Sequence, residues 1–172
     1  MENRERENLS PREAVEMIVR EHGDRLYRLC CLYLGNVQDA QDAVQEVLIK
    51  VFRHWDTFRY ESAVSTWLVR ITVYTCRDLR RSNWFRKVDR SFSADDVQDR
   101  RENEAQLSGD VTQAVLQLPE KYRLPVILHY YQGLAVKDVA SILHIPLNTA
   151  LTRLKRGRDQ LRGKLTEGGE LR

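Results

Sequence analysis

The sequence predicts an all-α protein built from two small helical domains joined by a flexible linker. Apolar residues recur at spacings of three and four along most of the chain, which is the period of an amphipathic helix. A run of Asp and Glu residues from Asp95 to Asp110 interrupts this pattern near the middle. We therefore place a first domain at residues 10–88, an acidic linker at 89–108 and a second domain at 109–166.

The charge distribution indicates a polyanionic partner. The net charge of the 172 residues is only +3, but Arg77–Arg90 and Arg153–Lys164 are both strongly basic. The N-terminus, Met1–Glu7, is highly charged, and no apolar run reaches the roughly 20 residues that a membrane-spanning helix needs. These features favour a cytoplasmic protein without membrane insertion.

Helix signals in the first domain follow in order. Ser10, Pro11 and Glu13 form a helix start, with Ser as the cap. An apolar stripe then leads to a stop at Gly35-Asn36. A second helix is predicted from Asp39. The apolar stripes of these two segments are Leu26, Leu29, Cys30 and Tyr33, and then Ala40, Val44, Val47, Val51 and Trp55.

The pattern breaks from Phe58 to Ser65, and a long helix from Trp67 to about Trp84 is predicted next. Within it, Ile71–Tyr74 has a local strand-like composition. In the second domain, a helix containing Val111, Val115 and Leu118 is expected to stop at Pro119. A helix over 124–131 follows, in which Pro125 is expected to sit early, and Gly133 ends it.

The segment from Lys137 to Arg158 predicts a helix-turn-helix with its turn at 144–146. We expect Asn148 to cap the second helix. The first helix has the apolar stripe Val136, Val139, Ala140 and Leu143. The second is expected to pack inward through Ala150, Leu154, Gly157 and Leu161, with Gly157 allowing close packing. The opposite face carries Thr149, Thr152, Arg153 and Arg156, which suits a DNA major groove; the alternative is a basic face that only contacts solvent.

Cysteine and histidine positions predict neither a metal nor a catalytic site. Cys30 and Cys31 are adjacent and Cys76 stands alone, which matches no common zinc-ligand spacing and favours buried free thiols. The four histidines lack metal or triad spacing; they are His22, His54, His129 and His144. We expect no cofactor, no bound metal and no catalytic residue.

Several segments together resemble the extracytoplasmic-function sigma factors, which are bacterial RNA polymerase specificity subunits of the sigma-70 family. Asp39–Arg53, Ser65–Ile71 and Asp78–Arg81 resemble the family's region two. Leu118-Pro119, Tyr122-Arg123 and the helix-turn-helix resemble its region four. The likeness runs from about Val15 to Leu165. It implies a non-enzymatic protein that binds core RNA polymerase and promoter DNA, both duplex and single-stranded. It also implies control by an anti-sigma factor, commonly membrane-associated, in an envelope or stress response.

The resemblance implies three sets of binding residues. Core polymerase would be bound by Asp42, Gln45 and Glu46, for which the alternative is a solvated acidic face. The melted minus-ten element would be bound by Phe58, Tyr60, Ser62, Ser65, Trp67, Arg70, Tyr74, Arg77, Arg80 and Arg81. The duplex minus-thirty-five element would be bound by Asn148, Thr149, Thr152, Arg153, Lys155 and Arg156. For the loop over 58–65, the alternative is a plain connection between helices.

Three positions depart from the family pattern. Tyr74 stands where the family commonly has Asn, so the resemblance does not imply the family's specific base contact there, whereas a tyrosine ring can stack on a base. Asn148 replaces a frequent Gly, and Leu151 replaces a frequent basic residue. Loss of one phosphate-reaching cation at Leu151 would lower the salt slope of binding by roughly one.

Two other classes of protein remain open from the sequence. A one-component transcriptional regulator can end in a similar helix-turn-helix, although it would need a sensor or dimerisation domain before it. A small helical enzyme would have to use the scattered histidines. A pull-down with core polymerase separates all three classes.

Overall fold

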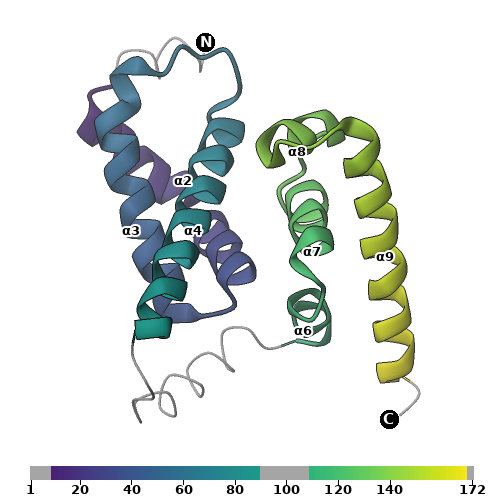
Figure 1. The fold of residues 1–172 in the computed structure, drawn as a ribbon. Coiled ribbons are helices and arrows are strands. Elements are labelled where there is room, and N and C mark those ends of the chain that lie inside the picture. Colours follow the sequence, from purple (N-terminus) through teal and green to yellow (C-terminus); the bar gives the residue numbers. More distant parts are fainter. Residues whose placement is uncertain (1–8, 90–108, 170–172) are drawn as a thin grey trace. The chain divides into compact units, whose positions relative to one another are not determined.

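The computed structural model describes residues 9–89 and 109–169, and every element in these ranges is a helix (Figure 1). The chain forms two compact units, Met1–Phe92 and Ser93–Arg172. The predicted fold class is therefore confirmed. The predicted linker over 89–108 lies outside the described residues, apart from Asp89, which ends a helix of the first unit.

The first helix, α2 (Pro11–Leu34), begins and ends as its sequence predicts. The Ser10 hydroxyl accepts a hydrogen bond from the Glu13 amide at 3.4 Å, and the Glu13 carboxylate accepts one from the Ser10 amide at 2.9 Å. The Ser10 hydroxyl also donates to the Glu13 carboxylate at 2.7 Å, and this hydrogen bond, followed by the one from the Ser10 amide, lowers the pKa of the Glu13 carboxyl. At the other end, Gly35 takes the left-handed conformation with φ 69° and closes the helix onto the Cys31 carbonyl.

Helix α3 (Val37–His54) begins two residues before the predicted start at Asp39. The reason is Asn36, whose side chain accepts a hydrogen bond from the Asp39 amide at 2.9 Å and so acts as the cap. A single 3₁₀ turn, η1 (Trp55–Thr57), follows. The predicted stripe is buried except for Val44, which is half-buried, and Ala43 takes an inward position that the pattern did not indicate.

Helix α4 (Val64–Asp89) completes the first unit. It begins at Val64, so the loop ends two residues earlier than predicted, and the helix continues beyond the predicted end at Trp84. The strand-like stretch over 71–74 is helical, and the buried Thr72 hydroxyl bonds the Leu68 carbonyl at 2.8 Å within the same helix. Helices α2, α3 and α4 pack against one another around one apolar core, which shows how packing overrides local propensity.

The second unit contains α6 (Asp110–Leu116), α7 (Glu120–Val126), η2 (Ile127–Tyr131), α8 (Val136–Leu143) and α9 (Leu147–Gly169). The expectation that Pro125 lies early in its helix is wrong. Helix α7 begins at Glu120, since the Pro119 carbonyl accepts hydrogen bonds from the next turn, and Pro125 lies inside it. The helix then widens into a π-turn, closed by the bond from the Gln132 amide to the Ile127 carbonyl at 3.0 Å.

Helices α8 and α9 form the predicted helix-turn-helix, with two corrections. Asn148 is not the cap of α9, because the helix begins at Leu147 and the Pro146 carbonyl accepts from the Ala150 amide at 3.0 Å. In α8, Ile142 is buried and Leu143 only half-buried, a shift of one residue in the inward stripe. The chain reverses direction at His144, which takes the left-handed conformation with φ 53°.

Helix α9 packs along α6, α7 and α8 (Figure 1). Ala150 and Leu154 are buried and Leu161 is half-buried, as predicted. A side chain at Gly157 would meet Val126 Cγ2 at 2.7 Å and the Tyr122 carbonyl oxygen at 3.2 Å. The close packing expected at Gly157 is therefore confirmed, and it fixes how α9 lies against α7.

Candidate functional site

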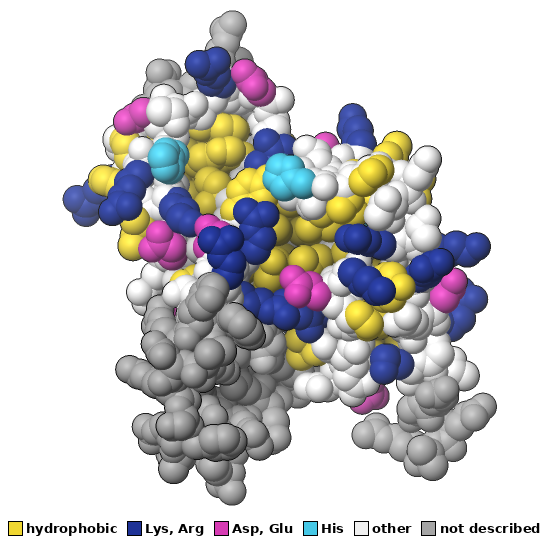
Figure 2. Space-filling model, viewed as in Figure 1, with side chains coloured by type: hydrophobic (Ala, Val, Ile, Leu, Met, Phe, Trp, Pro, Cys, Tyr) yellow, Lys and Arg dark blue, Asp and Glu magenta, His cyan; other side chains and the backbone are white. Residues whose placement is uncertain are grey.

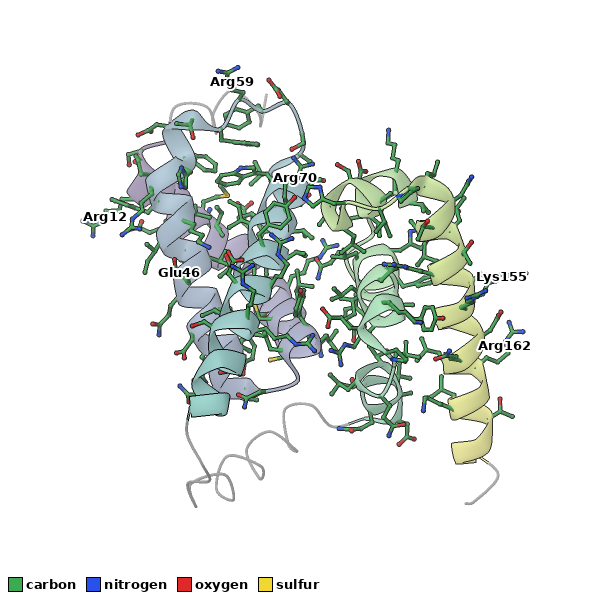
Figure 3. The ribbon with its side chains drawn as sticks, in the orientation of Figure 1. Arg12, Glu46, Arg59, Arg70, Lys155 and Arg162 are labelled. Carbon is green, nitrogen blue, oxygen red and sulfur yellow. The ribbon has the colours of Figure 1, made fainter. Side chains whose placement is uncertain are left out.

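One face of α3 carries the predicted polymerase-binding residues. Asp42 and Gln45 are exposed and Glu46 is half-buried, and Figure 3 labels Glu46 on this helix. Their spacing of three and four places them on one face, opposite the buried stripe. Two large apolar side chains extend the same face: Ile49 is 43% exposed and Phe52 is 54% exposed. The sequence analysis missed these two; their signal was an apolar residue outside the core stripe.

The loop between α3 and α4 is held by a cluster of four aromatic rings. Phe58 lies 4.6 Å from Trp67 and 4.5 Å from Tyr60, measured between ring centroids. Trp55 contacts the other three rings at 5.9 to 6.1 Å, and its indole nitrogen donates to the Leu9 carbonyl at 3.0 Å. Phe58, Tyr60 and Trp67 are half-buried. The rings thus pack on one another, and only the outer edge of the cluster faces solvent.

The remaining loop residues predicted to bind DNA differ in exposure. Ser62 is exposed, whereas Ser65 is half-buried and belongs to α4. Tyr60 takes the left-handed conformation with φ 54°, which is uncommon for a residue with a side chain. Arg59, at the tip of the loop in Figure 3, is exposed as well. The loop therefore combines a fixed aromatic base with an exposed polar tip.

A basic stripe follows along α4. Arg70, Arg77 and Arg81 are exposed, and Tyr74 lies between them half-buried. The guanidinium carbon of Arg77 lies 5.0 Å from the centre of the Tyr74 ring, within the range of a cation–π contact. The structure thus brings Trp67, Arg70, Tyr74, Arg77 and Arg81 onto one face, with exposed Arg80 beside it.

In the second unit, an open groove of about 400 Å³ runs between α7 and α9. The predicted minus-thirty-five residues line it together with two residues of α7, giving Lys121, Tyr122, Asn148, Thr149, Thr152, Arg153 and Arg156. Only Lys155 of the predicted set lies outside it, and this side chain projects from α9 on the side away from α7 (Figure 3). The sequence did not indicate Lys121 as a binding residue, because the helix that contains it was predicted to begin only at residue 124.

The groove holds its basic side chains close to an aromatic ring. A hydrogen bond from Arg156 lowers the pKa of the Tyr122 hydroxyl. The Lys121 ammonium lies 5.0 Å from the centre of the Tyr122 ring, and the Thr152 hydroxyl donates to the Asn148 carbonyl at 2.8 Å. Figure 2 shows Lys and Arg side chains gathered over α9. The arrangement can donate hydrogen bonds to an anion through several groups at once.

No cluster of three His, Cys, Asp or Glu side chains able to hold a metal occurs over 9–89 or 109–169. Cys30, Cys31 and Cys76 are buried free thiols, as predicted, and the sulfurs of Cys30 and Cys76 lie 3.8 Å apart. The hydrogen bond with Cys76, and then burial, raise the pKa of the Cys30 thiol. Among the described helices, none is long and apolar enough to cross a membrane.

Comparison with known proteins identifies both units. The family model for sigma-70 region 2 matches residues 18–86, and that for sigma-70 region 4 matches residues 108–161. The chain is 33% identical over 169 residues to the ECF RNA polymerase sigma factor SigW of Bacillus subtilis, covering 90% of each protein. The chain belongs to the extracytoplasmic-function (ECF) sigma factors. It is also 33% identical over 157 residues to SigE of Mycolicibacterium smegmatis, covering 87% of this chain and 61% of that protein.

Solved structures share the fold of this sigma factor. The sigma factor RpoE of Bartonella quintana, crystallised with the anti-sigma factor NepR, matches with a TM-score of 0.71 at 20% identity, covering 88% of this chain and 96% of that one. CnrH, solved in complex with the cytosolic domain of CnrY, matches with a TM-score of 0.66 at 21% identity, covering 95% of this chain and 94% of that one.

Membership of the family decides against a one-component transcriptional regulator. The region 2 match occupies the part of the chain that a one-component regulator would use for sensing or dimerisation. Sigma factors are transcription initiation factors, and ECF sigma factors direct RNA polymerase to particular promoters. This sigma factor therefore acts in promoter-specific transcription initiation, with its two family regions falling in separate compact units.

Proposed function

We propose that this sigma factor reads the minus-thirty-five element as duplex through α9. The observation that carries this proposal is the division of α9 into two faces. Ala150 and Leu154 are buried against the rest of the unit, while Thr152 and Arg156 line an open groove. A major groove admits one helix, and arginine and threonine donate to phosphates and base edges. Lys121 of α7 adds a cation at the groove's other wall.

The second proposed surface is the loop and basic stripe of the first unit, which would hold the melted strand of the minus-ten element. Arg70, Arg77 and Arg81 are spaced along α4 so that they can follow one phosphate backbone. Unstacked bases would lie against the rim of the aromatic cluster, with Ser62 at the loop tip available to hydrogen-bond a base edge.

Strand opening is then a binding effect and needs no bond chemistry in this chain. Separating DNA costs on the order of 1 kcal/mol per base-pair step, and stacking of a base on an aromatic side chain contributes about 1–3 kcal/mol. Capture of one or two bases therefore suffices to shift a short segment toward the open state. The polymerase supplies the active site, so we assign no catalytic role to this protein, and we place it in the cytoplasm with its polymerase.

The third proposed surface is the face of α3 with Asp42, Gln45 and Glu46, which would bind core polymerase. Its polar residues are exposed or half-buried, and the apolar pair Ile49 and Phe52 provides area that a protein partner can bury. We also propose control by an anti-sigma factor, since both solved neighbours were captured in complexes, one with an anti-sigma factor by name.

Reconstitution with core polymerase tests these assignments separately. Replacing Asp42, Gln45 and Glu46 together by Ala should weaken core binding, measured by anisotropy of the labelled sigma factor, while the far-ultraviolet circular dichroism stays unchanged. Glu16→Ala is the matched control, because Glu16 is an exposed acid on α2. Unchanged core binding in the triple variant would refute the assignment of this α3 face to polymerase binding.

The α9 assignment is tested by transcription. Arg153→Ala should reduce transcripts most from promoters that depend on an upstream element, because Arg153 lines the groove. Arg162→Ala serves as the control, since Arg162 is exposed on the same helix but lies outside the groove. An equal loss on templates without an upstream element would indicate a general phosphate contact or a structural role.

A further inference from the structure

Two leucines are exposed on the N-terminal half of α9. Leu147 is 49% exposed and Leu151 is 48% exposed, and they lie one turn apart on the same side of the helix. They are not part of the inward stripe, which is supplied by Ala150 and Leu154 with 0% and 6% exposure. Neither the core nor the groove toward α7 explains an apolar pair at these positions.

The surroundings of this pair are those of a polyanion-binding surface. Leu151 has Asn148 three residues before it, Thr152 next to it and Lys155 four residues after it, and all three are exposed. No Asp or Glu occurs between Leu147 and Arg158. The charged residues of α9 from Leu147 to Arg158 are thus all basic, which complements nucleic acid.

We propose that Leu151, assisted by Leu147, contacts the C5-methyl group of a thymine in the upstream promoter element. The inference rests on the proposed function, in which α9 enters the major groove. The thymine methyl is the one apolar group that base edges present there. A leucine side chain can neither donate nor accept a hydrogen bond, so Leu151 discriminates by apolar contact alone. Where a basic residue would bind a phosphate or guanine, this chain would select thymine.

The expected effect is small and measurable. A methyl group removed from water by an apolar side chain strengthens binding by about fourfold, which is the contribution of one buried CH₂-sized group. The contribution should vanish when either the leucine side chain or the thymine methyl is removed. Removing both groups should weaken binding no more than removing one of them, because the two groups make one contact.

The test uses holoenzyme assembled from the full chain and core polymerase. Duplexes with a randomised upstream element are selected by the wild-type holoenzyme, and the enriched duplex is then synthesised with 2′-deoxyuridine replacing single thymidines. Uracil pairs as thymine does but lacks the methyl group. At one or two positions, the substitution should weaken wild-type binding about fourfold. The Leu151→Ala holoenzyme should bind both duplexes equally.

A matched control is available on the same helix. Leu165 is 38% exposed near the end of α9, so Leu165→Ala should keep the wild-type ratio between thymidine and deoxyuridine duplexes. Circular dichroism of both variants should equal that of the wild type, since each removes an exposed side chain.

The outcomes separate this inference from the proposed function. A wild-type holoenzyme that shows no dependence on any upstream element overturns the α9 assignment itself. One that selects an upstream element but binds thymidine and deoxyuridine duplexes equally overturns only the role of Leu151. An unchanged ratio in Leu151→Ala together with weaker core binding also overturns it, because the pair would then contact polymerase.

Discussion

Replacing Gly157 by Ala should loosen α9 from α7 and so disturb the groove that we propose binds DNA. An added Cβ would lie 2.7 Å from Val126 Cγ2 and 3.2 Å from the carbonyl oxygen of Tyr122. The valine methyl can shift, but the carbonyl belongs to the backbone of α7. Relief therefore requires the two helices to move apart, and Tyr122 and Arg156, which line the groove from opposite helices, move apart with them.

The magnitude follows from two opposing terms. Overpacking a close helix contact costs about 1–3 kcal/mol. Replacing Gly by Ala inside a helix contributes about 0.8–1.0 kcal/mol in the stabilising direction. Because a backbone atom limits the relaxation, we take the upper part of the first range. We expect Gly157→Ala to lower the free energy of unfolding by about 1–2 kcal/mol after the two terms are combined.

Gly163 on the same helix supplies the matched control. A Cβ there would have nothing within 4 Å, so Gly163→Ala should raise the free energy of unfolding by about 1 kcal/mol through helix propensity alone. Both variants can be measured by urea unfolding followed at the α-helical circular dichroism band, with hydrogen exchange of the α9 amides as the local probe. Equal shifts in the two variants would refute the argument that helix contact at Gly157 sets the position of α9.

Three further predictions concern single side chains. Tyr122→Phe removes the hydroxyl that bonds Arg156, and duplex binding by the holoenzyme should weaken about fivefold, the effect of one ordinary hydrogen bond; Tyr130→Phe, at an exposed ring outside the groove, should bind as the wild type does. Phe52→Ala should lower the affinity for core polymerase about tenfold by removing an exposed aromatic ring that the proposed complex would bury in part. Val19→Ala, which removes a similarly exposed apolar side chain from α2, should not lower it. Glu13→Gln should reduce stability near neutral pH, because the pKa of Glu13 is lowered in the folded state and its contribution is present above the ordinary glutamate value of 4.5. That difference from the wild type, measured by urea unfolding, should disappear as the pH falls through the lowered pKa, and a difference that grows in acid would contradict the role of the Ser10 cap.

The sequence was most informative where a single residue type has one structural use. Ser10 with Glu13 and Gly35 marked the two ends of α2, and Gly157 marked a close helix contact. Boundaries failed where two signals competed. Pro119 was taken as the end of one helix, but α6 already ends at Leu116 and the Pro119 carbonyl begins the next helix. This error placed Pro125 too near a helix start. Periodicity cannot distinguish those two uses of proline.

The binding surfaces were predicted less completely than the fold. Lys121 reaches the groove from a helix far from α9 in sequence, and no local pattern reports such a neighbour. Ile49 and Phe52 were hidden for a different reason. An apolar residue in a helix is first assigned to the core, and only the exposure of Ile49 and Phe52 in the folded chain shows that these two lie outside it. The aromatic cluster likewise joins three segments and became visible only in the fold.

The aromatic cluster suggests that the two proposed DNA-binding surfaces differ in the free-energy cost of recognition. Four rings at 4.5 to 6.1 Å, tied to the Leu9 carbonyl through Trp55, hold the loop over 58–63 in shape before any DNA arrives. A base that is captured there need not order the loop, so most of the stacking free energy remains to offset strand separation. In the proposed function α9 reads intact duplex, so it would have no cost of strand separation to offset. Its groove needs only correctly placed donors, and its affinity can be modest because the two units are carried on one chain and bound to one polymerase.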